Sequence, residues 1–194
     1  MKFRLMVNLF LLVCKYDTGN YGLNQWRVTS NKNIHMTVNT KNLPDDYDVH
    51  IEHVHADIML KSTEPQIDGI TQDSMDDSDH RVPTEGFPVN DDISYHNIFA
   101  IEGYTDQFYQ LWGYAFGDIG SVSSSYQRLT EKNIREVGTY AEKLSVVYDI
   151  VISKPECKEG YVKSVESEIL IPLTSEIQTV EANFWTGEVV EEKE

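Results

Sequence analysis

Side chains that alternate between apolar and polar recur along this chain, and turn residues separate the alternating stretches. The clearest case lies between residues 34 and 40, where the two parities are Ile34, Met36 and Val38 against His35, Thr37 and Asn39. Residues 143–153 and 161–173 alternate in the same way. A period of two is typical of a β-strand with one buried and one solvated face. The chain is therefore expected to fold mainly from antiparallel strands.

Helical patterns are scarce beside these strands. Residues 129–138 favour one short helix, because Thr130 suits its N-cap, Glu131 its first turn and Gly138 its end. Residues 108–116 are apolar on both parities, which favours a central strand covered on both faces. We therefore expect an antiparallel β-sandwich, immunoglobulin-like in shape, with long loops and at most one or two short helices.

One domain, residues 31–186, is expected to hold these strands. Within it, residues 62–97 contain three prolines and many acidic residues, which predicts a long acidic surface loop. The aspartates of this loop lack the spacing of an EF-hand, so a solvated loop is favoured over a calcium site. Residues 15–30, rich in Gly and Asn, are expected to form a tether or loop, and residues 187–194 an acidic tail.

The N-terminal stretch MKFRLMVNLFLLVC places Lys2 and Arg4 before an apolar run that ends at Cys14. It resembles a bacterial lipoprotein signal, in which the cysteine after the apolar run is lipidated and becomes the new N-terminus. The resemblance implies a leader over residues 1–14 and lipidation at Cys14, although Val13 stands where a small residue is expected. The alternative is a buried N-terminal strand in which Cys14 is a small core residue. Cys157 is expected in an exposed turn.

Acidic residues outnumber basic ones by 32 to 16, which gives a formal net charge of −16. Such a chain is not expected to bind nucleic acid directly, because its carboxylates repel phosphates. If the charge has a role in binding, the expected partner is another protein with a basic surface. The alternative is that the charge serves solubility through self-repulsion.

Sequence motifs of catalysis are missing from the chain. They include the nucleophile elbow, the Gly-rich phosphate loop, the dinucleotide fingerprint, the H-E-x-x-H helix and the C-x-x-C pair. We therefore expect neither an enzyme activity nor a cofactor.

The stretch HIEHVHADIM, residues 50–59, holds three of the six histidines. Apolar residues before His53 have odd numbers and those after it have even numbers: Val49 and Ile51, then Val54, Ala56, Ile58 and Leu60. One extra residue, a β-bulge at Glu52–His53, lets both sets face the core. The histidines then lie on or near one polar face.

The turn KNLPDDYD is short enough to join residues 34–40 and 48–60 as an antiparallel hairpin, which would pair His35 with Glu52. Such a hairpin would gather the candidate metal ligands His35, His50, His53 and His55. Imidazoles beside carboxylates suit Zn²⁺ and similar ions. The alternative, which we favour, is a solvated strand face held by cross-strand hydrogen bonds.

Two functions fit these features. The leading expectation is a non-enzymatic, extracytoplasmic binding domain that acts by protein contact, either secreted or held at the cell surface by a lipid on Cys14. A lipid anchor would be its only contact with a membrane. The alternative is a cytoplasmic acidic inhibitor that imitates DNA in the basic cleft of a nucleic-acid enzyme. An exported leader favours the first, and an ordered N-terminal strand favours the second.

Overall fold

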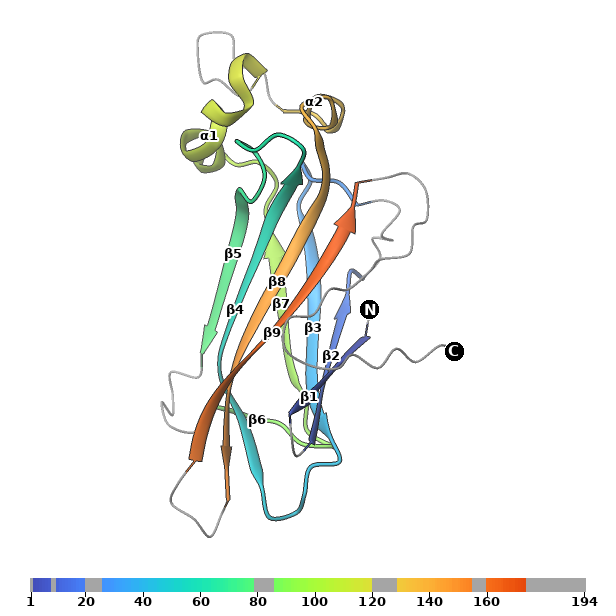
Figure 1. Cartoon of the computed structure of the whole chain (residues 1–194), viewed down its shortest axis with the longest axis vertical. Helices are drawn as coiled ribbons and strands as arrows, with labels where there is room; N and C mark the ends of the chain where they lie inside the picture. The colour runs from blue at the N-terminus through green and yellow to red at the C-terminus, as the bar shows by residue number, and fades with distance from the viewer. Residues whose placement is uncertain are drawn as a thin grey trace.

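Two stacked antiparallel sheets make up most of the protein (Figure 1). The structure is a computed structural model of the 194-residue chain. It describes residues 2–7, 10–19, 26–78, 86–119, 129–154 and 160–173, and only the backbone of 2–7. The predicted acidic tail 187–194, the end of the predicted domain and Cys157 lie outside these residues.

The first sheet has the strand order β1-β2-β3-β7. Its strands are β1 (Lys2–Val7), β2 (Phe10–Asp17), β3 (Lys32–Lys41) and β7 (Tyr95–Ile101). The second sheet has the order β5-β4-β8-β9, and the short strand β6 also pairs with β4. Its strands are β4 (Asp48–Ser62), β5 (Thr71–Ser78), β6 (Phe87–Pro88), β8 (Thr139–Ser153) and β9 (Gly160–Pro172).

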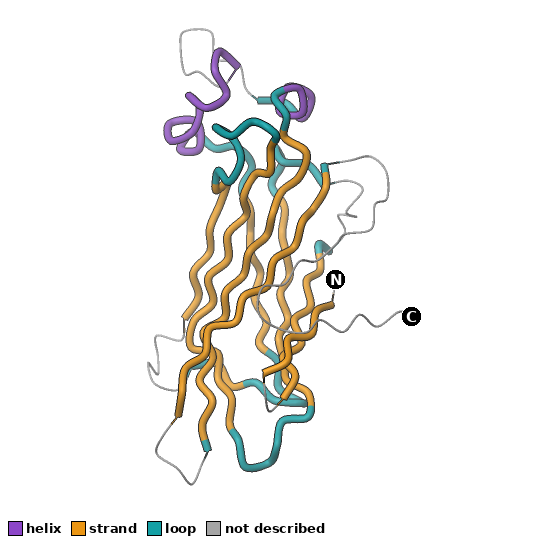
Figure 2. Tube along the Cα trace, viewed as in Figure 1, coloured by secondary structure: helices purple, strands orange, loops and turns teal. Residues whose placement is uncertain are grey.

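The core lies between the two layers of strands that Figure 2 draws in orange. Buried apolar side chains of β2, β3, β4, β7, β8 and β9 point into it. Polar groups also join the sheets there. The Tyr16 hydroxyl lies 2.8 Å from the Tyr148 hydroxyl and 2.5 Å from Ser167 Oγ, and all three residues are buried. Because buried hydroxyls need hydrogen-bond partners, these contacts favour one position of the first sheet relative to the second.

The helical segments sit together at one end of the sheets, at the top of Figure 1. They are α1 (Asp106–Trp112), a 3₁₀ segment (Gly113–Ile119) and α2 (Glu131–Glu136). Thr130 and Asn133 form a capping box, and Gly138 follows with φ of 90°. The helix predicted over 129–138 is thus confirmed, as is a mainly β fold of antiparallel strands with few short helices.

The central strand predicted over residues 108–116 is wrong, because this segment is α1 and the 3₁₀ segment. Thr105 caps α1 by accepting a hydrogen bond from the Phe108 amide. Phe108 and Tyr109 are buried against the core. A short apolar run suits a helix packed on one side as well as it suits a covered strand, so its pattern does not separate the two.

The long acidic loop predicted over residues 62–97 is also wrong, since β5, β6 and the start of β7 lie within it. Strand β5 lacks apolar alternation because its inward side is partly polar. Asp77, on that side, accepts hydrogen bonds from the Tyr95 hydroxyl and the Asn97 amide of β7. An edge strand that buries carboxylates against polar partners gives no period-two signal.

The N-terminal segment belongs to the first sheet, where β2 lies between β1 and β3. Leu12 and Cys14 are fully buried, and burial raises the pKa of the Cys14 thiol to about 12. The tether predicted over residues 15–30 is wrong in part, because β2 extends to Asp17 and Trp26 is buried. The structure thus has the arrangement of the alternative, a buried strand, while processing and lipidation at Cys14 stay predictions.

In the described part of the chain, each helix falls short of the length and apolar content that a bilayer crossing requires.

Candidate functional site

Strand β4 carries a bulge that turns its histidines outward. The pairing of β4 with β8 shifts register between Ile51 and His53, so Glu52 is the extra residue. Ile51 before the bulge and Val54 after it are both fully buried. The bulge predicted at Glu52–His53 is therefore confirmed. The polar parity after it, including His55, faces solvent on the outer side of the second sheet.

The hairpin predicted from the turn KNLPDDYD is wrong. Strand β3 pairs with β2 and β7, whereas β4 pairs with strands of the other sheet. The segment between them crosses from one layer to the other, and the Asp91 carboxylate holds its start by accepting the backbone amides of Asn42 and Leu43. The connection is short enough for a hairpin. Because the chain instead crosses between the layers, β3 and β4 bury their apolar side chains against each other's sheet.

As a result, the four candidate histidines do not assemble. His35 lies on the outer side of the first sheet, opposite Asp17 and Ile98. His50 lies on β4 before the bulge. Only His53 and His55 come together, with ring centroids 6.4 Å apart.

A chain of hydrogen bonds crosses four strands of the second sheet, β5, β4, β8 and β9, through these two rings. Asp76 Oδ1 of β5 lies 3.0 Å from His53 Nε2 and 2.9 Å from His55 Nδ1. The other ring nitrogens meet further carboxylates, Asp149 of β8 at 3.3 Å and Asp57 of β4 at 3.0 Å. Ser74 of β5 and Ser164 of β9 end the chain, each 2.5 Å from a carboxylate oxygen of Asp57 and Asp149 respectively.

This geometry favours a protonated His55 ring. A neutral imidazole has only one N–H. Its other nitrogen would place a lone pair against the lone pairs of a carboxylate oxygen, which is repulsive. An imidazolium donates from both nitrogens. Hydrogen bonding to Asp76 accordingly raises the pKa of His55, with Asp57 adding to the effect. The same contacts with His55 and His53 lower the pKa of Asp76.

Both nitrogens of each ring already contact carboxylates, so a metal ion would have to displace these hydrogen bonds. Within the described ranges, no three His, Cys, Asp or Glu side chains are placed to hold a metal ion. The arrangement therefore acts as a charged hydrogen-bond network on an exposed strand face.

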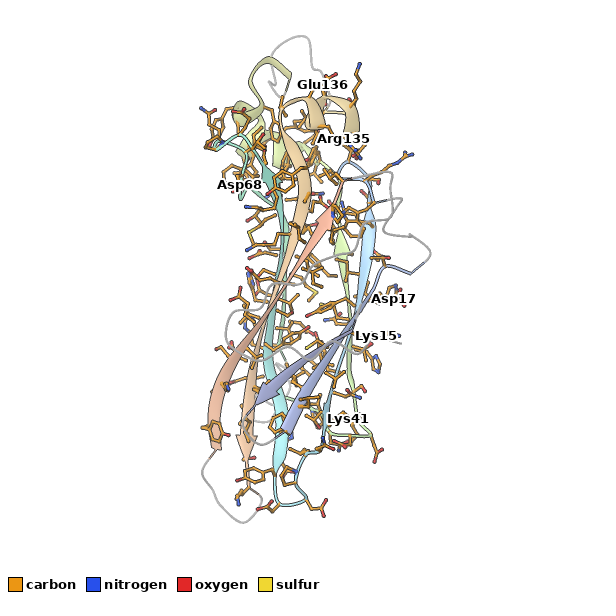
Figure 3. All side chains as sticks on the ribbon, turned by 45° about the vertical axis from the view of Figure 1, so that its right-hand side comes forward. Lys15, Asp17, Lys41, Asp68, Arg135 and Glu136 are labelled. Carbon is orange, nitrogen blue, oxygen red and sulfur yellow. The ribbon has the colours of Figure 1, made fainter. Side chains whose placement is uncertain are left out.

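The two outer faces of the protein differ in charge. The acidic face, on the outer side of the second sheet, is defined by five carboxylates across its strands: Asp57, Asp76, Asp149, Glu166 and Glu168. Lys61 of β4 and Lys143 of β8 stand among them, and Lys143 pairs with Glu168 at 2.5 Å. On the described part of the first sheet, the outward charged groups are Lys15, Asp17 and Lys41, seen along β2 and β3 in Figure 3.

A buried ion pair lies near the helical end. Lys32 Nζ is 3.2 Å from Glu142 Oε2, and their side chains are 2% and 0% exposed. The Trp26 indole N–H also donates to Glu142, and Lys32 Nζ lies 4.9 Å from the Trp26 ring centroid. Burial raises the pKa of Glu142 and lowers that of Lys32. Sequence reasoning missed this pair, although both residues stand on the apolar parity of their strands.

The pH dependence of His55 gives a first prediction. Its pKa is raised in the folded state, so its contribution to stability is fully present below its ordinary pKa of 6.5. That contribution is lost as pH rises through the folded-state pKa. Because the ring is partly exposed, we expect less than about 1 kcal/mol. NMR titration of the imidazole signals measures the shift. Asp57→Asn should lower the His55 pKa, and an unchanged value would contradict the assigned contacts.

Comparisons with known proteins add little to this geometry. No family model matches the chain, and none of the curated proteins does. A crystal structure of a protein from Archaeoglobus fulgidus aligns over 86% of this chain and 97% of that chain, with 12% sequence identity and a TM-score of 0.34. At that TM-score the likeness supports no argument about fold or function.

Proposed function

We propose that this protein is a non-enzymatic binding domain that contacts a basic partner protein through its acidic face. The observation that carries the proposal is the uneven charge of the two outer faces. Carboxylates that served solubility alone would have no reason to gather on one sheet. Here Asp57, Asp76 and Asp149 are held in place by the histidine network, which fixes the pattern of charge that a partner meets.

The size of this face suits a transient contact. Along the eight residues of β5, where all four strands lie side by side, spacings of about 4.8 Å between strands and about 3.3 Å between residues give a face of roughly 500 Å². Stable complexes bury about 800 Å² per partner, so a contact confined to this stretch predicts a weaker complex. Charge complementarity mainly raises association rates and specificity. A salt-sensitive, rapidly exchanging complex is therefore expected.

A charge-reversal pair tests the face. Glu166→Lys is expected to weaken binding of a short unstructured peptide of lysine, arginine and glycine by about fivefold at low salt, through lost attraction and added repulsion. The matched control, Glu136→Lys on α2, makes the same change at an exposed site on the helical end. Isothermal titration calorimetry at two salt concentrations measures both. Equal losses for the two variants would show that only net charge matters.

The acidic DNA mimic remains the second candidate, and the ordered strand β2 is the observation that favours it. Such an inhibitor would compete with duplex DNA for a basic nuclease. The acidic face interrupts its carboxylates with Lys61, Lys143 and two histidines, unlike the unbroken phosphates of DNA. We expect no such competition, and displacement of DNA by this protein would reverse the order of the two candidates.

An immunoglobulin-like shape and an extracytoplasmic location belong to this proposal as well. The first rests on the stacked antiparallel sheets, and the second on the resemblance of residues 1–14 to a lipoprotein signal. The contact proposed for the acidic face is independent of both, because it depends only on the second sheet.

A further inference from the structure

A pocket of about 330 Å³ lies between α1 and the start of β5, beside the acidic face. In Figure 1, α1 sits above the upper end of β5. One wall is apolar and comes from Phe108, Leu111 and Trp112 of α1. Leu111 is 55% exposed. The pocket therefore offers an apolar surface, including an aromatic ring, that this chain leaves accessible.

The opposite wall supplies hydrogen-bond acceptors. It includes Gln72, Asp73 and Glu102, and the pocket's lining contains no Lys, Arg or His among the described residues. The Gln72 amide nitrogen donates to the carbonyl oxygens of Val28 and Glu102, at 3.0 and 2.9 Å. These two acceptors fix which way the amide points, so its oxygen is left buried without a partner in the described part of the chain. What the wall presents to the pocket is the negative charge of two carboxylates, Asp73 and Glu102.

Asp73 is held rigidly in this wall. One carboxylate oxygen accepts the Ser74 amide at 2.9 Å and the other accepts the Glu102 amide at 2.8 Å. Ser74 also reaches Asp57 through its hydroxyl. The pocket wall is therefore continuous with the hydrogen-bond network of the acidic face.

We propose that this pocket binds the guanidinium group of an arginine side chain on the basic partner protein. A guanidinium is planar, always charged and rich in donors, so it can stack on an aromatic ring while it donates to several acceptors. Lysine offers a compact charge that does not stack in this way. The identity of the partner rests on the proposed function, but occupancy of the pocket is measured without any partner.

The test uses the full chain and N-acetyl-arginine amide, followed by NMR. We expect shifts at the Trp112 indole N–H and at the backbone amides of Ser74 and Glu102. The citrulline analogue, which has the same shape without the charge, should bind at least about fivefold more weakly. Trp112→Phe assigns the indole signal. Equal binding of the citrulline analogue, or shifts elsewhere on the protein, would overturn the inference.

Variants separate the pocket from the acidic face. Glu102 is exposed, so Glu102→Gln should leave the fold intact and weaken the arginine ligand at least about threefold. Glu136→Gln on α2 is the matched control and should change nothing. If Glu102→Gln has no effect while Glu166→Lys still weakens the basic peptide, the pocket inference fails and the proposed function stands. If the amide alone binds as tightly as the peptide, the ligand is a free small molecule and the assignment to a protein is wrong.

Discussion

A chain from which residues 1–13 have been deleted is expected to lose cooperative folding. The deletion removes β1 and the first half of β2, which is hydrogen-bonded to β3 from Leu11 to Asp17. Three side chains that are at most 6% exposed are lost with it: Phe10, Leu12 and Val13. Each contributes about 1.5–3 kcal/mol by burial, and the sum is comparable to the total stability of about 5–15 kcal/mol of a typical domain.

Thermal unfolding followed by circular dichroism measures this effect. Leu12→Ala is the milder companion, expected to cost about 2–5 kcal/mol because it leaves a cavity between the sheets. A removable leader and a buried strand predict opposite effects of the deletion on the unfolding temperature. A truncated chain that unfolds at the same temperature as the full chain would support a dispensable leader and refute the structural role of β2.

Replacing Lys32 by Met is expected to destabilise the protein by about 3–5 kcal/mol, because the Glu142 carboxylate is left buried without its counter-charge. Trp26 still donates one hydrogen bond to Glu142, which does not replace the lost cation. Glu142 is fully buried, so water cannot reach it in the folded state.

Denaturant unfolding of a double-mutant cycle measures the pair. The partner substitution Glu142→Leu, added to Lys32→Met, should recover most of the loss, since a buried ion pair can be replaced by apolar side chains. Without Lys32 the pKa of Glu142 should rise further. The loss should then grow as pH rises through that folded-state pKa and shrink at acid pH. A pH-independent loss below about 1 kcal/mol would show that the pair is not buried as described.

The parts of the fold that could be predicted from sequence are those in which burial is decided locally. Alternation identified β3, β8 and β9, and the change of parity around Glu52 located the bulge in β4. The capping residues Thr130 and Gly138 identified α2. In each case the order of apolar and polar side chains within one strand or helix indicates which of its faces is buried.

The parts that could not be predicted depend on contacts between distant segments. Strand β5 could not be predicted from alternation, because one of its inward residues is the polar Asp77. Its carboxylate accepts hydrogen bonds from Tyr95 and Asn97 of the other sheet. Which sheet β4 would join was equally undetermined, since its short connection to β3 permits both a hairpin and a crossing.

The same limit applies to the candidate site. The sequence placed His53 and His55 on one polar face, yet their carboxylate partners come from other strands. Asp76 lies 23 positions from His53, and Asp149 lies 96 positions from it. Only the registers of β4 with β5 and β8 bring these groups together.

The contact role of the acidic face is tested most directly by mapping where a basic peptide binds. Backbone amide signals of the isotope-labelled full chain are followed by NMR while the lysine–arginine–glycine peptide is added at low salt. The account predicts shifts concentrated in β4, β5, β8 and β9, reversed by added salt, with the signals of β2, β3 and β7 unchanged. Shifts spread evenly over both sheets, or centred on the first sheet, would contradict it.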